Sequence, residues 1–189
     1  AVLCFSIVDA TAKWLGQVYS PMQILFFRHL FGVIPIAFLL WRSGSFRGLR
    51  TRRPHLHAVR AGLLFTALLS FFEALRSLPL AEAVAVAFTA PLFVTALSGP
   101  LLGEPVGPRR WAAVAVGFVG TLIMVRPGTE AFQPAALLVL LSALSFALAM
   151  LLTRKMSRTE TDVSMVAYTS LIAGLGSVPF LAFVWRAPP

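Results

Sequence analysis

Long apolar segments, separated by short breaks, are the feature that most constrains how this chain can fold. Seven of them cover roughly residues 1–18, 22–41, 56–76, 80–102, 109–125, 134–153 and 162–185. A helix needs about 20 apolar residues to cross the hydrocarbon core of a bilayer, and most of the segments approach that length. Hydrophobic residues make up 58% of the chain and charged residues 12%, against about a quarter charged in soluble domains. The sequence therefore predicts an all-α membrane protein, a polytopic bundle of about seven transmembrane helices.

Three prolines interrupt these segments, and the chain both begins and ends at an apolar run. Pro35, Pro91 and Pro100 each remove a backbone donor and can kink a helix. Neither an initiator Met nor a basic flank precedes the first run, so we expect a piece of a longer protein. Asp9 and Lys13 within that run argue against a secretory signal peptide.

The cations are distributed unevenly among the breaks. Eleven of the sixteen lie in or beside the second, fourth and sixth breaks: Arg42, Arg47, Arg50, Arg52, Arg53, Arg60, Arg109, Arg110, Arg154, Lys155 and Arg158. Lys and Arg gather on the cytoplasmic side of membrane proteins. We therefore expect these breaks, and a missing N-terminus, to face the cytoplasm of a bacterial inner (plasma) membrane. Because the cations lie between apolar runs rather than along a solvated face, the net charge of +9 does not predict a nucleic-acid partner.

A weak internal repeat appears when the chain is shifted by 141 residues. In each copy a cation closes an apolar helix, and a polar residue opens the next helix at equal spacing. The matched pairs are Leu3 with Leu144, Phe5 with Phe146, Lys13 with Arg154, and Gln23 with Ser164. Five spans separate the copies, and an odd number inserts the second copy upside down. Inverted repeats with a site between them are a common plan of secondary transporters.

Short motifs also follow one another in a definite order along the first 126 residues. They are FSIVDA at 5–10, KW at 13–14, SPMQ at 20–23, FR at 27–28, FEALR at 72–76, SLPLA at 77–81, TAPL at 89–92, LGE at 102–104 and GFVG at 117–120. In order and spacing they resemble the EamA branch of the drug/metabolite transporter superfamily. A thinner match continues from residue 134 onward.

This resemblance implies ten helices, arranged as two inverted five-helix EamA repeats around a central substrate cavity. On that plan residues 1–126 form the first repeat, with about five helices, and residues 134–189 begin the second, inverted repeat with two. Members of the branch move amino acids, nucleotide-like metabolites, riboflavin, S-adenosylmethionine or drugs. The resemblance thus implies a carrier of small organic metabolites that works by alternating access. The chain departs from the family plan in having only seven helices.

Ionisable residues inside apolar runs are the first candidates for a substrate site, because each costs on the order of 2.5 to 3.5 kcal/mol near mid-membrane. Asp9 and Lys13 lie four residues apart, on one face of a helix. Either they line the cavity and contact a charged or zwitterionic substrate, or they form a structural ion pair. Arg28, further along, either holds a carboxylate or phosphate or extends to the membrane interface.

Three further residues complete the predicted substrate site. Glu73 is the acid we expect to couple transport to a proton, unless it pairs with Arg76 at the end of its helix. Thr89, beside Pro91, marks a polar spot in mid-helix that either lines the pathway or accompanies simple curvature. Ser145 either faces the cavity or bonds its own backbone.

Nothing in the sequence resembles a soluble active site, since there is no phosphate-binding glycine loop, HExxH motif or paired-cysteine site. We expect His55 and His57 to belong to the positive flank rather than to bind a metal. No catalytic residue, metal or cofactor is predicted. The alternatives are an intramembrane enzyme of the acyl or lipid transferase kind and a structural membrane module. Expected partners are a small-molecule substrate, the lipid bilayer and a coupling proton, and a homodimer stays open.

Overall fold

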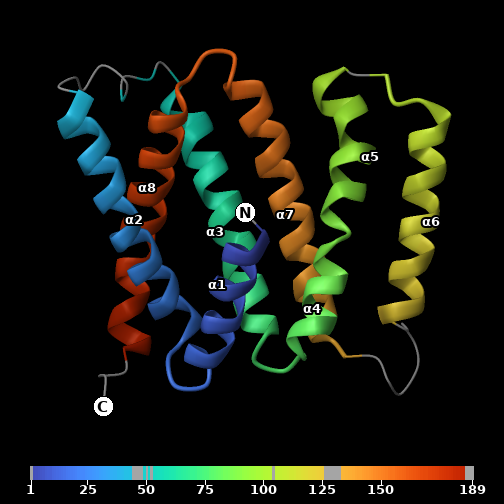
Figure 1. The fold of residues 1–189 in the computed structure, drawn as a ribbon, viewed down its shortest axis with the longest axis horizontal. Coiled ribbons are helices and arrows are strands. Elements are labelled where there is room, and N and C mark those ends of the chain that lie inside the picture. Colours follow the sequence, from blue (N-terminus) through green and yellow to red (C-terminus); the bar gives the residue numbers. More distant parts are fainter. Residues whose placement is uncertain are drawn as a thin grey trace.

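A computed structural model describes residues 2–43, 49, 51, 53–103, 105–125 and 133–185. This part of the chain folds into helices and connections, without strands. The helices are α1 (Val2–Leu15), α2 (Pro21–Ser43), α3 (Pro54–Ala74), α4 (Leu80–Ala87), α5 (Ala90–Leu102), α6 (Pro108–Val125), α7 (Ala135–Met156) and α8 (Asp162–Val184) (Figure 1). The predicted all-α architecture is confirmed.

Local sequence signals explain several of the helix ends. Three helices, α2, α3 and α6, begin at a proline, which fits the first turn because an N–H group there has no helical acceptor. At the start of α8 the Thr161 side chain accepts a hydrogen bond from the Ser164 amide at 3.1 Å, the usual role of an N-cap threonine. Helix α5 ends at Gly103, whose φ of 70° is the left-handed conformation that glycine adopts without strain.

The apolar segment 80–102 is one candidate membrane span, but it consists of two helices, α4 and α5, rather than one continuous helix. The chain turns at Phe88 and Thr89, between α4 and α5. Pro91 explains the break, because it has no N–H group for the Ala87 carbonyl and its ring crowds that carbonyl. Pro35 and Pro100, by contrast, lie inside α2 and α5 without interrupting them.

Helix α3 lies at the centre of the bundle and packs against α7 and α8 (Figure 1). Helix α2 packs on α8 at one side, and α5 packs on α7 at the other with α6 outside it. Small buried residues, among them Ala61 and Ala67 on α3 and Ala143 on α7, let the two central helices approach closely. Their contact includes a buried hydrogen bond of 2.7 Å from the Ser142 hydroxyl to the Ala67 carbonyl.

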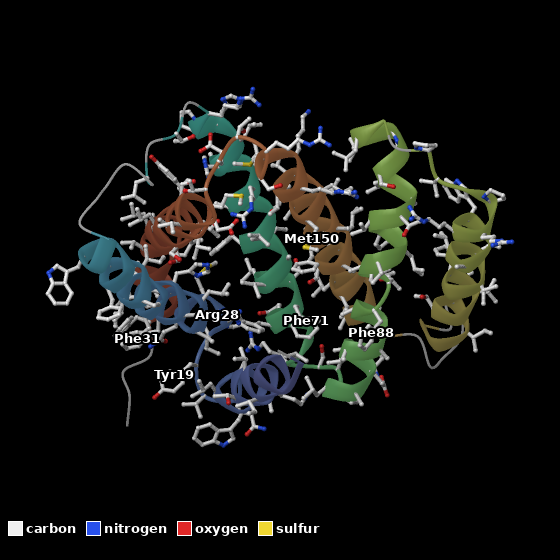
Figure 2. The ribbon with its side chains drawn as sticks, turned by 45° about the horizontal axis from the view of Figure 1, so that its top comes forward. Tyr19, Arg28, Phe31, Phe71, Phe88 and Met150 are labelled. Atoms are coloured by element: carbon white, nitrogen blue, oxygen red, sulfur yellow. The ribbon has the colours of Figure 1, made fainter. Side chains whose placement is uncertain are left out.

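The outer surface of this bundle is apolar. Large side chains such as Phe31, Phe88 and Met150 point away from it and are 50% to 72% exposed (Figure 2). Five segments of the described chain are long and apolar enough to cross a membrane, by length and composition: Pro21–Phe38, Pro54–Ala74, Leu80–Leu102, Ala135–Met156 and Asp162–Leu181. An apolar surface of this extent requires hydrocarbon rather than water around it.

Exposed tryptophans and cations lie at the ends of the helices. Trp14 lies in the last turn of α1 and Trp185 directly follows α8, whereas Trp41 and Trp111 lie near the end of α2 and the start of α6, at the opposite end of the bundle. Tryptophans at two levels are typical of the two membrane interfaces. The end with Trp41 and Trp111 also carries most of the exposed cations: Arg53, Arg109, Arg110, Arg154, Lys155 and Arg158.

Candidate functional site

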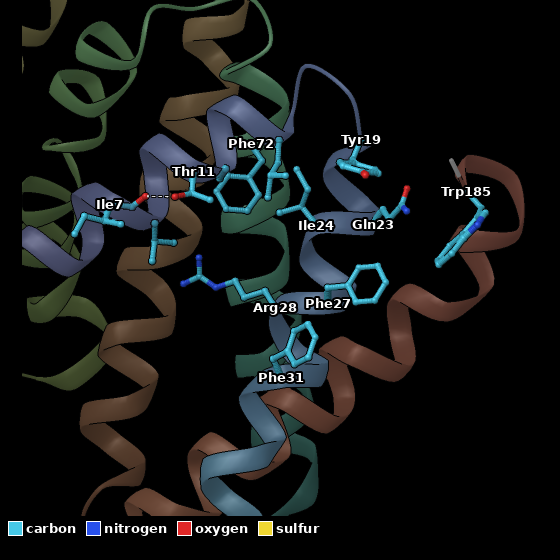
Figure 3. A pocket seen from close by; sticks show the side chains of 13 residues that line it. Ile7, Thr11, Tyr19, Gln23, Ile24, Phe27, Arg28, Phe31, Phe72 and Trp185 are labelled. Carbon is cyan, nitrogen blue, oxygen red and sulfur yellow. Dashed lines mark hydrogen bonds between the residues drawn. The ribbon is translucent and has the colours of Figure 1, made fainter. Parts of the chain in front are cut away.

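A groove of about 560 Å³ lies between α1 and α2, and we call it the α1–α2 groove. Helix α1 contributes one wall and α2 the other, while Phe72 of α3 and Trp185, just after α8, complete the lining (Figure 3). Its lining residues are Ile7, Val8, Thr11, Ala12, Leu15, Tyr19, Gln23, Ile24, Phe27, Arg28, Phe31, Phe72 and Trp185. The volume lies in the range of small-molecule binding sites.

Aromatic rings dominate this lining. Phe27 stacks on Phe31 with ring centroids 6.2 Å apart, and the Phe27 centroid lies 6.1 Å from that of Trp185. Tyr19 and Phe72 add two more rings. Ring faces offer flat, polarisable surface to a planar ligand.

Two polar side chains from α2 interrupt the apolar lining. Arg28 reaches into the groove from the middle of the α2 wall, and Gln23 lies nearer the start of the same helix (Figure 3). A guanidinium group binds carboxylate or phosphate through two parallel hydrogen bonds. The groove therefore combines aromatic ring surface with a guanidinium group.

The predicted cationic residues of α1 and α2 have different surroundings. Arg28 lines the α1–α2 groove, as described. Lys13 instead donates hydrogen bonds to two carbonyl oxygens in the turn that follows α3, that of Leu75 at 3.1 Å and that of Leu78 at 2.6 Å. A cation at a helix C-terminus satisfies carbonyls that have no helical donor and complements the helix dipole. Asp9 belongs to α1, but its side chain lies outside the described residues.

The remaining predicted residues lie away from this groove. Glu73 forms an exposed ion pair of 3.1 Å with Arg76, so the pair weighed in the sequence is present. Thr89 is buried at the α4–α5 break, where its hydroxyl donates to the Val86 carbonyl at 2.8 Å. Ser145 is buried on α7. The structure thus brings Arg28 to the groove, and places Glu73, Thr89 and Ser145 elsewhere.

A second polar site, at the other end of α3, was missed in the sequence. His57 belongs to α3, is 1% exposed, and approaches the Glu160 carboxylate at 3.4 Å. His57 is therefore buried within α3 rather than in the arginine-rich loop expected for it, whereas His55 is exposed. Arg60, counted with the same flank, lies within α3 and bonds to α7 and α8. The position of Arg60 inside an apolar run could have indicated this polar site from the sequence, because a charge within a membrane helix requires polar partners.

In the described part of the chain, no three His, Cys, Asp or Glu side chains lie close enough together to hold a metal ion.

A bundle of long apolar helices with an apolar outer surface and tryptophans at both ends is a multi-pass membrane protein. Its residues 1–126 match the EamA-like transporter family, and the chain belongs to that family. The resemblance found in the sequence is therefore confirmed.

Several curated proteins are similar over most of this chain. The S-adenosylmethionine uptake transporter of Rickettsia prowazekii (strain Madrid E) is 32% identical over 184 residues, which are 97% of this chain and 62% of that protein. A riboflavin transporter of Rhizobium johnstonii is 31% identical over 170 residues, 89% of this chain and 56% of that protein. A pseudopaline exporter of Pseudomonas aeruginosa is 29% identical over 182 residues, 96% of this chain and 63% of that protein.

The chain spans about 62% of the length of the S-adenosylmethionine uptake transporter that it matches. No solved structure matches it.

Proposed function

We propose that the full-length protein carries small organic metabolites across a bacterial inner membrane by alternating access. Membership of the EamA-like transporter family supports this, as do relatives named for both uptake and export. Because those relatives are named as transporters, we also propose that the protein is a carrier rather than an intramembrane enzyme.

The proposed architecture has two inverted repeats, with residues 1–126 as the first and residues 134–189 as the start of the second. The proposed orientation places the connections that follow α2, α5 and α7 in the cytoplasm. Exposed cations at that end of the bundle support it, including Arg109, Arg154 and Arg158, since Lys and Arg favour the cytoplasmic side.

The α1–α2 groove is the proposed substrate site, and its pairing of Arg28 with aromatic rings is the observation that carries the proposal. The substrate would place a planar ring against Phe27 and Phe31 and an anionic group at Arg28. Lys13, bonded to α3 carbonyls, supports the wall of the groove rather than the substrate.

Flux measurements on proteoliposomes that contain the full-length protein test this site. S-Adenosylmethionine carries a carboxylate and riboflavin does not, so the two report on Arg28 differently. We expect Arg28→Gln to raise the KM for a carboxylate substrate by roughly tenfold or more, because a hydrogen bond to a charged group contributes about 1.5–3 kcal/mol. Riboflavin flux, if present, should change much less.

Arg110→Gln is the matched control, because it removes an exposed cation from the start of α6, away from the groove. It should leave KM unchanged. Equal KM values for Arg28→Gln and the parent would refute the site while keeping the carrier. Absence of flux for every metabolite in a broad panel, from correctly inserted protein, would refute the carrier.

A further inference from the structure

A cluster of polar contacts lies where α3 begins and α7 turns into α8. Glu160, in the α7–α8 turn, accepts a hydrogen bond from the Thr51 hydroxyl at 2.9 Å. Its second oxygen lies 3.4 Å from His57 Nε2. The side chains of His57 and Glu160 are 0% and 4% exposed. The imidazole also lies against the Tyr168 ring of α8, with ring centroids 4.6 Å apart.

Arg60 forms a second layer, about one turn further along α3. Its guanidinium donates to the Thr153 hydroxyl at 2.6 Å, to the Met165 carbonyl at 2.9 Å and to the Thr169 hydroxyl at 2.6 Å. These acceptors belong to α7 and α8. Both layers therefore join α3 to α7 and α8 at one end of the bundle.

This junction has a direct relation to the proposed function, on which the following inference rests. In the proposed architecture α3 belongs to the first repeat, and α7 and α8 belong to the second. Alternating access requires the repeats to separate at one end and then at the other. Separation at this end must break the contacts of Glu160 with Thr51 and His57. It must also break the contacts of Arg60 with α7 and α8.

The hydrogen bonds that the His57 ring can make depend on which of its nitrogens carry hydrogen. Nδ1 is buried and has no hydrogen-bond partner among the described residues. Every ring hydrogen has an acceptor when the ring is neutral with its hydrogen on Nε2, because Nε2 then donates to an ionised Glu160. Nδ1 carries no hydrogen in that form and needs no acceptor. A proton added to the ring creates a buried Nδ1–H donor without an acceptor. A proton on Oε2, the Glu160 oxygen that faces His57, either opposes Nε2–H as donor to donor or moves the ring hydrogen to Nδ1.

A proton at the contact between the His57 ring and Glu160 Oε2 is thus penalised while the junction is closed, and opening would let water reach Nδ1. A buried donor without an acceptor costs enough to shift an equilibrium roughly tenfold or more. The other charged groups on these elements do not share the burial of the pair. Arg60 is directed to the Thr153 layer, and exposed charges flank the junction: Arg53, His55, Arg154, Lys155, Arg158 and Asp162.

We propose that the His57–Glu160 pair is a proton-binding site, and that the bound proton opens the junction of α3 with α7 and α8. The proton occupies the pair while the junction is open and must leave before it closes. This couples the exposure of the substrate site on one side of the membrane to the proton concentration there. The coupling acid is then Glu160 with His57, in place of Glu73, which is exposed and paired with Arg76.

The test measures the junction itself rather than transport. Spin labels are attached to Val59→Cys on α3 and Val166→Cys on α8, both about half exposed, in full-length protein that carries Cys4→Ser and no other native cysteine. Distance distributions are recorded in lipid nanodiscs between about pH 8 and about pH 5. We expect the longer-distance population to rise roughly tenfold as the pH falls.

His57→Gln keeps a donor for Glu160 but removes the ring nitrogens, so its distribution should stay short across the same pH range. His55→Gln, two residues earlier and exposed, is the matched control and should respond like the parent. Glu160→Gln tests the pair from its other member. It replaces an ionised acceptor by a neutral amide and should raise the longer-distance population already at neutral pH.

A parent distribution that does not change with pH would overturn the proposal, as would a His57→Gln distribution that still follows the parent. If His57→Gln does not fold, an unchanged neutral-pH distribution for Glu160→Gln would overturn the proposal in its place. Because no substrate is present, the outcome is independent of whether the α1–α2 groove binds a metabolite. A failed flux assay with an intact pH response would reject the substrate site and keep the proton site.

Discussion

Replacing Lys13 by methionine separates a structural role for this residue from a role in substrate binding. Lys13 donates two hydrogen bonds to carbonyls at the C-terminal end of α3. A cation at a helix C-terminus is worth about 0.3–1 kcal/mol, and a hydrogen bond to a charged group contributes about 1.5–3 kcal/mol. Lys13 is only half-buried, and methionine keeps much of the apolar contact of the stem. We therefore expect Lys13→Met to lower the free energy of unfolding by about 1–2 kcal/mol.

The assay is reversible unfolding of the full-length protein in mixed micelles with increasing denaturing detergent, beside substrate flux from liposomes. Lys155→Met is the matched control, because Lys155 is exposed in the last turn of its own helix, α7. It should change the free energy of unfolding by less than about 0.5 kcal/mol. Unchanged stability of Lys13→Met together with a large loss of substrate affinity would refute the structural role and return Lys13 to the substrate site.

Two further predictions concern packing between helices. Ser142→Ala removes the hydrogen bond from α7 to the Ala67 carbonyl of α3. The same unfolding assay should show a loss of about 0.6 kcal/mol, the average for such bonds in membranes, and at most about 1.7 kcal/mol; no loss would mean that the contact adds nothing. A Cβ atom at Gly117 of α6 would lie 2.8 Å from the Leu92 side chain of α5, so Gly117→Ile should cost about 1–3 kcal/mol by overpacking. Gly120→Ile, at a position with open space, should leave stability nearly unchanged, and equal losses at both glycines would contradict the close approach of α6 to α5.

Local sequence was sufficient to predict the helices but not the course of each interrupted segment. Apolar runs predict membrane helices because composition and length alone decide whether a segment suits hydrocarbon. Prolines mark where a helix loses a backbone bond, yet Pro35 lies within a continuous helix and Pro91 follows a break. At the break, the hydroxyl of Thr89 bonds the Val86 carbonyl. Whether such local bonds compensate for the lost helical backbone hydrogen bonds depends on packing between helices, which cannot be predicted from the sequence.

The polar contacts were harder to predict, because they join residues far apart in the chain. Lys13 lies four residues from Asp9, which suggested an ion pair, but the carbonyls it bonds are 62 and 65 residues away. His57 and Glu160 are separated by 103 residues, and Glu160 stood in a segment interpreted only as a turn. Helical periodicity relates residues three or four positions apart. It carries no information on which turn at the end of a bundle meets which helix.

The bonds of Arg60 also determine the order in which this protein can be assembled during synthesis. Its three acceptors lie 93, 105 and 109 residues further along the chain. A ribosome that adds about 5–20 residues per second needs roughly 5 to 20 seconds to produce them. Until then the nascent α3 carries a guanidinium without these acceptors, at a cost of at most about 2.5–3.5 kcal/mol, the value for a charge at the centre of a membrane helix. The arginine must remain near water or the insertion machinery for that time, and α3 reaches its final depth only when α7 and α8 arrive beside it.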